Sequence, residues 1–155
     1  MAIREADAQG TLGDHAAASN ALSRAHRAYE SGRGHDPDWV YLPRPEFEGL
    51  VGIIQTSLGD SKAASQSFQT AIDGSAAWPR ERAEWYLLEA QNQIRAGDVA
   101  KGCTLLSTNL AQIHGVASTR LHNKLTMLAR QVTPHAKVPE VREFLGARAE
   151  YLAAN

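Results

Sequence analysis

The sequence predicts an all-α protein built from about four antiparallel helix hairpins. Three copies of one short turn carry this prediction: Leu12-Gly13-Asp14, Leu58-Gly59-Asp60 and Ala96-Gly97-Asp98. Glycine adopts the left-handed conformation that ends a helix, and the aspartate accepts hydrogen bonds from the free N–H groups that open the next one. Strand signals are almost absent, because Ala, Leu, Gln, Glu and Arg recur at helical spacing while β-branched residues are scattered.

The amino-terminal half is expected to hold four helices, joined in pairs by two of these turns. A short helix covers Ala2–Gly10, and its turn leads into a longer one over Asp14–Ser31. The second pair covers Pro45–Ser57 and Ser61–Asp73, and the serine that opens its second helix is a good capping residue.

Four more helices are expected in the carboxyl-terminal half. The third pair covers Pro79–Arg95 and Asp98–Ile113, and the fourth covers Ala117–Thr133 and Pro139–Ala153. Two of these helices begin with proline, whose missing N–H would be unbonded in a first helical turn in any case. Another begins with an aspartate that suits the capping position.

The spacing of the turns indicates a repeated hairpin. Gly13 and Gly59 are 46 residues apart and Gly59 and Gly97 are 38 apart, compared with a common helical-repeat period of about 34. The excess residues correspond to Gly32–Pro43 and to Gly74–Ala77, which both fall in loops between hairpins. The period is therefore interrupted only where an insertion does little harm.

The second hairpin carries a recognisable residue pattern. Gly52 precedes Gly59 by seven residues, and Ala64, Phe68 and Ala71 follow in a small–aromatic–small order. This region resembles the tetratricopeptide repeat, and the other hairpins keep the pattern less fully. The resemblance implies a tetratricopeptide-like right-handed solenoid whose inner helices line a concave face.

Two further segments give a more particular resemblance. Asp36-Pro37-Asp38-Trp39 lies in the first insertion, and Pro134-His135 is followed by the run Val138–Leu145. In this order they resemble the carboxyl-terminal domain of actinobacterial Xre-type helix-turn-helix transcriptional regulators, over about Asp14–Leu152. The resemblance implies a regulatory domain. It does not imply direct DNA binding by this chain, because the sequence holds no helix-turn-helix segment.

Composition narrows the class of protein. The 155 residues are expected to form a single domain, and a net charge of −1 lacks the basic excess of a nucleic-acid-binding protein. No apolar run approaches the roughly 20 residues that span a bilayer, and the amino terminus lacks the apolar stretch of a signal peptide. The lone Cys103 permits no internal disulfide, which suits a reducing compartment. We therefore expect a cytoplasmic chain without membrane contact.

The register of the turns predicts which side chains line a ligand or peptide groove. Gln55 and Gln93 occupy equivalent positions where the family usually has a bulky aromatic residue, which indicates a polar interior contact or a ligand-facing amide. The alternative to a groove is an ordinary mixed surface, because singly exposed apolar residues are normal. The predicted groove residues are Glu46, Ile53, Gln55, Thr56, Glu84, Leu87, Gln91, Gln93, Ile94, Arg95, Lys124 and Leu128.

The first insertion offers a second candidate surface. Long loops in compact domains are often functional, so His35, Asp36, Asp38, Trp39 and Tyr41 are candidates for a partner-contact loop. The alternative is that the tryptophan fills the gap between two hairpins while the aspartates shape turns. No metal site is predicted there, because neither a second histidine nor a cysteine lies nearby in the sequence.

Catalytic patterns are not apparent. The six histidines are scattered, none of them forms a zinc-hydrolase motif, and no glycine-rich phosphate loop follows a strand. Cys103 is predicted to be a small buried residue of a helix rather than a nucleophile. No catalytic residue, metal or cofactor is predicted, and enzyme activity is left open with no positive support.

The resulting prediction is a non-catalytic ligand- or peptide-sensing or protein-interaction module. Its partner would be a peptide, a small molecule, another protein or a second copy of the chain. The alternative is a stand-alone small-molecule-binding protein or enzyme that reuses the groove. A closed pocket lined by Gln55, Gln93, Trp85 and His122 would favour that alternative, whereas an open groove would favour the module.

Overall fold

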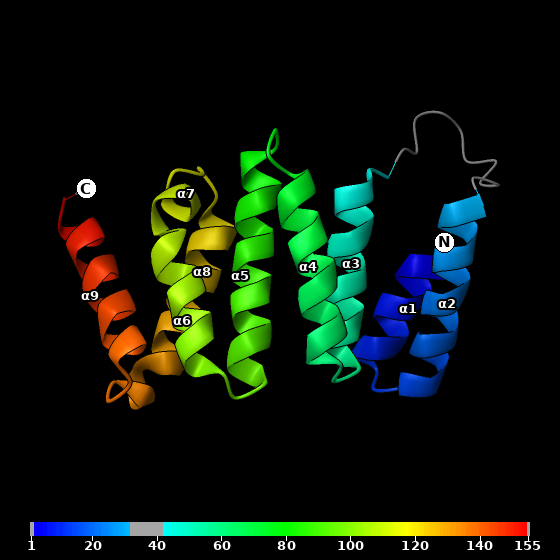
Figure 1. Ribbon diagram of the computed structural model, residues 1–155, viewed down its shortest axis with the longest axis horizontal. Coiled ribbons are helices and arrows are strands. Elements are labelled where there is room, and N and C mark those ends of the chain that lie inside the picture. The colour runs from blue at the N-terminus through cyan, green and yellow to red at the C-terminus, as the bar shows by residue number, and fades with distance from the viewer. Residues whose placement is uncertain (1, 32–41, 155) are drawn as a thin grey trace. The chain divides into compact units, whose positions relative to one another are not determined.

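The computed structural model describes residues 2–31 and 42–154, and this part of the chain contains helices and no strand (Figure 1). The all-α prediction is confirmed for these residues. The helices are α1 (Ala2–Thr11), α2 (His15–Ser31), α3 (Arg44–Ser57), α4 (Ser61–Gly74), α5 (Pro79–Arg95), α6 (Val99–Thr108), α7 (Leu110–His114), α8 (Thr119–Val132) and α9 (Pro139–Ala154), with a 3-10 turn, η1, at Thr133–His135.

The three Gly-Asp turns share one geometry, as the sequence predicted. The φ angles of Gly13, Gly59 and Gly97 are +80°, +80° and +92°, a left-handed conformation that glycine adopts without a steric penalty. In each turn the aspartate N–H donates to the carbonyl of a glutamine five residues earlier, at 2.9–3.0 Å. Each aspartate carboxylate also accepts from the N–H three residues later, at 3.0 Å. The turn thus provides hydrogen-bond partners for backbone groups at the end of one helix and at the start of the next.

One predicted helix was wrong in extent, whereas the ends of the other helices differ from the prediction by at most two residues. The helix expected over Asp98–Ile113 is interrupted at Asn109, whose φ of −108° and ψ of 10° separate α6 from α7. The Asn109 side-chain amide donates to the carbonyl of Leu105 at 2.9 Å, the same carbonyl that its backbone N–H reaches at 3.3 Å. A side chain that competes for a helical carbonyl in this way weakens the local ladder.

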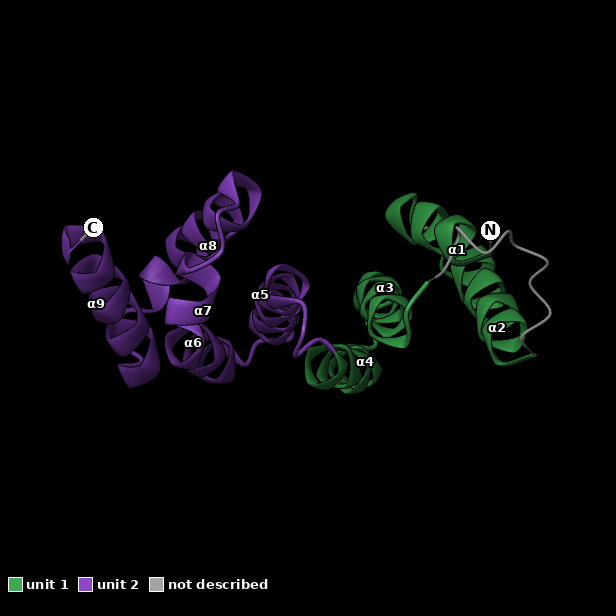
Figure 2. Cartoon of the chain, turned by 90° about the horizontal axis from the view of Figure 1, so that it is seen from above, with its two compact units in different colours: residues 1–74 green, residues 75–155 purple. Residues whose placement is uncertain are grey.

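Residues 1–74 form one compact unit, called unit 1 here (Figure 2). Within it α1 packs against α2, α3 packs against α4, and α3 also contacts α1 and α2. The α3–α4 pair approaches closely at Gly52, where a Cβ atom would lie 2.8 Å from the ring of Phe68. The small residue predicted to allow this approach therefore has that role.

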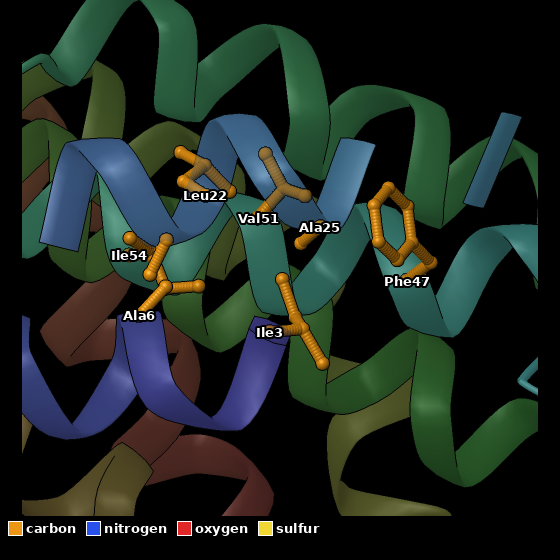
Figure 3. Packing of buried hydrophobic residues seen from close by; sticks show 8 residues of the cluster. Ile3, Ala6, Leu22, Ala25, Phe47, Val51 and Ile54 are labelled. Atoms are coloured by element: carbon orange, nitrogen blue, oxygen red, sulfur yellow. The ribbon is translucent and has the colours of Figure 1, made fainter. Parts of the chain in front are cut away.

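Figure 3 shows a cluster of buried hydrophobic side chains in unit 1. Buried side chains from α1, α2 and α3 meet there, and Tyr29 stacks on Phe47 with ring centroids 4.1 Å apart. The cluster consists of Ile3, Ala6, Ala21, Leu22, Ala25, Phe47, Val51 and Ile54. Alanines on α1 and α2 keep these helices close together, while the larger residues of α3 fill the space between them.

Residues 75–155 form the second compact unit, unit 2. Helix α5 packs against α6 and also contacts α7 and α8. The fourth predicted pair differs from the others, because α9 packs mainly on α6. Its link to α8 includes a hydrogen bond of 2.9 Å from Arg148 Nη2 to Thr126 Oγ1. Among the helices of both units, none has the length and apolar character of a membrane span.

Candidate functional site

A pocket of about 460 Å³ lies in unit 2 and opens to solvent. Its volume falls within the range of about 300–1,000 Å³ that is usual for small-molecule sites. The pocket is lined by Gln91 of α5 and by Lys124, Met127, Leu128, Arg130 and Gln131 of α8. Three of these, Gln91, Lys124 and Leu128, are among the predicted groove residues, and their role in a ligand groove stays a prediction.

Helix α8 supplies most of the pocket because it is strongly two-faced. Its buried residues recur at helical spacing and form one apolar stripe against the rest of unit 2: Leu121, Leu125, Leu128, Ala129 and Val132. Ser118 caps its first turn by accepting from the N–H of Leu121. The remaining face carries Arg120, Lys124 and Arg130, and the helix has no acidic residue. The pocket therefore lies where an apolar stripe meets a basic face.

The charged side chains beside the pocket differ in whether they form ion pairs. Glu84 of α5 accepts from Arg120 Nη2 at 2.5 Å, and the glutamate side chain is only 19% exposed. Burial lowers the pKa of Lys124; Glu84 opposes this shift, while Arg120 and Arg95 add to it. Among the described residues, no carboxylate forms an ion pair with Lys124. Its ammonium group is thus partly desolvated.

The other groove candidates of unit 2 do not line this pocket. Leu87, Gln93 and Ile94 are buried, and Arg95 is exposed at the end of α5. Glu84 contributes indirectly, because its ion pair positions Arg120 one turn before Lys124 on α8.

The amide of Gln93 makes an interior contact. Its Nε2 donates to Glu89 Oε1 at 2.6 Å, and Asn92 Nδ2 donates to Glu89 Oε2 at 3.2 Å. All three side chains are buried on α5. Of the two roles considered for this glutamine, the polar interior contact is the one that these hydrogen bonds give it. The sequence signal for Glu89 was present, since residues three and four positions apart share a helix face.

The remaining groove candidates lie in unit 1. Glu46 is exposed, whereas Ile53, Gln55 and Thr56 are half-buried. Thr56 Oγ1 donates to the carbonyl of Gly52 at 2.9 Å. The Oε1 atom of Gln55 is buried without a hydrogen-bond partner among the described residues. Their role in a ligand groove stays a prediction.

Gln9 is a third member of the glutamine set that the sequence reasoning missed. The carbonyls of Gln9, Gln55 and Gln93 each accept the aspartate N–H of the following Gly-Asp turn. The signal was available, because Gln stands four residues before the turn glycine in all three copies. This repetition shows that the glutamines share a backbone position, although their side chains have different surroundings.

A polar cluster in unit 2 was also missed. His114 of α7 stacks on Tyr151 of α9 with ring centroids 4.1 Å apart, and its centroid is 5.3 Å from that of His122 on α8. Burial lowers the pKa of His114, and the nearby His122 and Arg148 lower it further. The two Nε2 atoms are buried and have no hydrogen-bond partner among the described residues. Histidines eight positions apart gave no sequence signal of this contact.

Cys103 is buried on α6, as expected for a small helical residue. Burial, with a smaller contribution from Glu140, raises the pKa of its thiol to about 11. The protonated form therefore predominates at neutral pH, and a nucleophilic role gains no support. Across residues 2–31 and 42–154, no group of three or more His, Cys, Asp or Glu side chains is arranged to hold a metal ion.

The candidate partner-contact loop, with His35, Asp36, Asp38, Trp39 and Tyr41, lies outside the described residues. Comparison of the chain with protein families, curated proteins and solved structures gives no match.

Proposed function

We propose that this chain is a non-catalytic ligand-sensing or protein-interaction module whose ligand binds in the α5–α8 pocket. The observation that carries the proposal is the meeting of Gln91, Lys124 and Leu128 around one solvent-open pocket. Amides, a cation and aliphatic groups give such a site orientation, charge recognition and contact area.

We further propose that the fold is a tetratricopeptide-like solenoid resembling the regulatory domain of Xre-type regulators. Three helix pairs joined by the same turn, and the close approach of α3 and α4 at Gly52, support this assignment. In such a module the ligand binds one conformation more tightly than another, and that difference in affinity shifts pairing with a protein partner. A crystal structure in which the hairpins follow no right-handed superhelix would refute the assignment.

The enzyme alternative gains no observation in its favour. A closed pocket lined by Gln55, Gln93, Trp85 and His122 would favour a stand-alone small-molecule-binding protein or enzyme. The pocket in unit 2 is open, and Gln93, Trp85 and His122 are not among its lining residues. An open site of this kind favours a binding module.

The test is a thermal-shift screen of a metabolite and peptide panel against the wild-type chain and Met127→Trp. Met127 lines the pocket and is 68% exposed, so a larger side chain can occupy the pocket without disturbing the core. A ligand at 100 times its Kd stabilises the folded state by about 2.7 kcal/mol. We expect hits that lose most of this stabilisation in Met127→Trp.

The matched control is Leu152→Trp, at an exposed site on α9 outside the pocket. This variant should keep the ligand response of the wild-type chain. Hits that stabilise Met127→Trp as strongly as Leu152→Trp would show that the α5–α8 pocket is not the binding site.

A further inference from the structure

The charge of the α5–α8 pocket narrows the chemistry of its ligand. Lys124 and Arg130 line the pocket, and no carboxylate is among its lining residues. Glu84, which acts electrostatically on Lys124, forms an ion pair with Arg120 at 2.5 Å. An anion in the pocket would therefore meet two positive side chains without displacing an existing ion pair.

The same pocket has an apolar wall. Met127 is 68% exposed and presents its flexible thioether side chain there, whereas Leu128, which also lines the pocket, is 2% exposed and belongs to the buried stripe of α8. Exposed methionine is typical of surfaces that adapt to apolar ligands. Gln91 and Gln131 add amide groups that can donate to or accept from a polar head group.

We propose that the pocket takes an amphiphilic acid, with its anionic head group between Lys124 and Arg130 and its apolar body against Leu128 and Met127. This inference rests on the proposed function and adds the class of ligand to it. The head group is a carboxylate or a phosphate, because both accept charge-assisted hydrogen bonds from lysine and arginine.

Lys124 carries most of the recognition. Its ammonium is partly desolvated and lacks a carboxylate partner among the described residues, whereas Arg130 is exposed to solvent. A charge-assisted hydrogen bond is strengthened where water is excluded. Loss of the lysine charge should therefore weaken binding more than loss of the arginine charge.

The experiment compares decanoate, decyl phosphate and decanol by isothermal titration calorimetry, below the critical micelle concentrations of the two anions and the solubility limit of decanol. The three probes share one apolar body and differ in the head group. Both anions should bind at least about tenfold more tightly than decanol, which corresponds to one charge-assisted contact. The preferred anion identifies the source of the head group, and acetate with inorganic phosphate shows whether the apolar body is required.

Variants test the assignment of each charge. Lys124→Met keeps the aliphatic length and should reduce the affinity for decanoate by about tenfold or more, with little change for decanol. Lys101→Met, at an exposed site on α6, is the matched control and should bind as the wild-type chain does. Arg130→Gln is compared in the same way with Arg142→Gln on α9, which is also exposed. Circular dichroism of each variant confirms that it is folded.

The outcomes separate this inference from the function on which it rests. Decanol bound as tightly as decanoate, with both lost in Met127→Trp, would overturn the anionic head group and leave the pocket as a ligand site. The inference also fails if no amphiphilic probe binds, or if Lys124→Met and Lys101→Met bind decanoate equally well. The proposed function fails separately if panel hits are insensitive to Met127→Trp.

Discussion

Replacing Gly52 by alanine should destabilise the chain, although alanine is the better helix former. A Cβ at this position would lie 2.8, 2.8 and 3.0 Å from three ring carbons of Phe68. Ordinary van der Waals contact begins near 3.4 Å, so the new methyl group is about 0.6 Å too close. Phe68 is 1% exposed and has little room to move away.

The expected magnitude follows from two opposing effects. Alanine in a helix gains roughly 0.5–1 kcal/mol over glycine, whereas overpacking a core costs about 1–3 kcal/mol. The net expectation is a loss of about 1–2 kcal/mol in the free energy of unfolding. Urea titration followed by far-UV circular dichroism measures this loss directly.

Gly146 provides the matched control. It lies within α9, and a Cβ there would have no neighbour within 4 Å. Gly146→Ala should therefore stabilise the chain by about 0.5–1 kcal/mol, the opposite sign to Gly52→Ala. If Gly52→Ala stabilises the chain as Gly146→Ala does, the close α3–α4 contact is absent and the argument is refuted. Pairing Gly52→Ala with Phe68→Leu should relieve part of the cost.

Three other predictions concern a cap, a histidine and the cysteine. Asp60→Ala removes the carboxylate that accepts from the N–H of Ala63 at 3.0 Å, and urea unfolding should show that the free energy of unfolding falls by about 1 kcal/mol. The control is Asp73→Ala, at an exposed site near the end of α4, which should lower this free energy by less. The pKa of His114 is lowered from 6.5, so the unfolded chain binds more protons and the free energy of unfolding should fall as the pH drops below about 6.5. His114→Phe should flatten this dependence between pH 8 and pH 5, and an unchanged slope would contradict the assignment. Because the thiol pKa of Cys103 is raised to about 11 and the side chain is buried, maleimide should label it only when the chain unfolds; rapid labelling of the folded chain would refute this.

Features set by neighbouring residues were predictable from the sequence. The Gly-Asp turns fix their own conformation, because the glycine, the capping aspartate and the glutamine carbonyl lie within six consecutive positions. Both ends of the helix Pro79–Arg95 were predicted correctly because their signals are also local, with a proline at the start and a Gly-Asp turn after the end. The interruption at Asn109 also has a local cause, but an asparagine inside a helical pattern does not reveal whether its side chain will compete for a carbonyl.

Features that join distant segments were harder to predict. The register predicted inner helix faces for Gln91, Lys124 and Leu128; all three line the α5–α8 pocket, and their role in a ligand groove stays a prediction. The packing of α9 on α6 and the stacking of His114 on Tyr151 depend on side-chain volumes in several helices at once. Periodicity within one helix carries no information about which of several apolar neighbours that helix will choose.

The three turns also bear on how quickly the chain folds. Their hydrogen bonds join groups no more than five residues apart, so little chain entropy is lost before each helix pair can meet. Proteins dominated by such local contacts fold on the microsecond-to-millisecond scale. Once the turn has formed, the two helices of a hairpin are held close together, so each helix meets its partner at a high local concentration. We therefore expect a substitution in a Gly-Asp turn to slow folding more than it speeds unfolding.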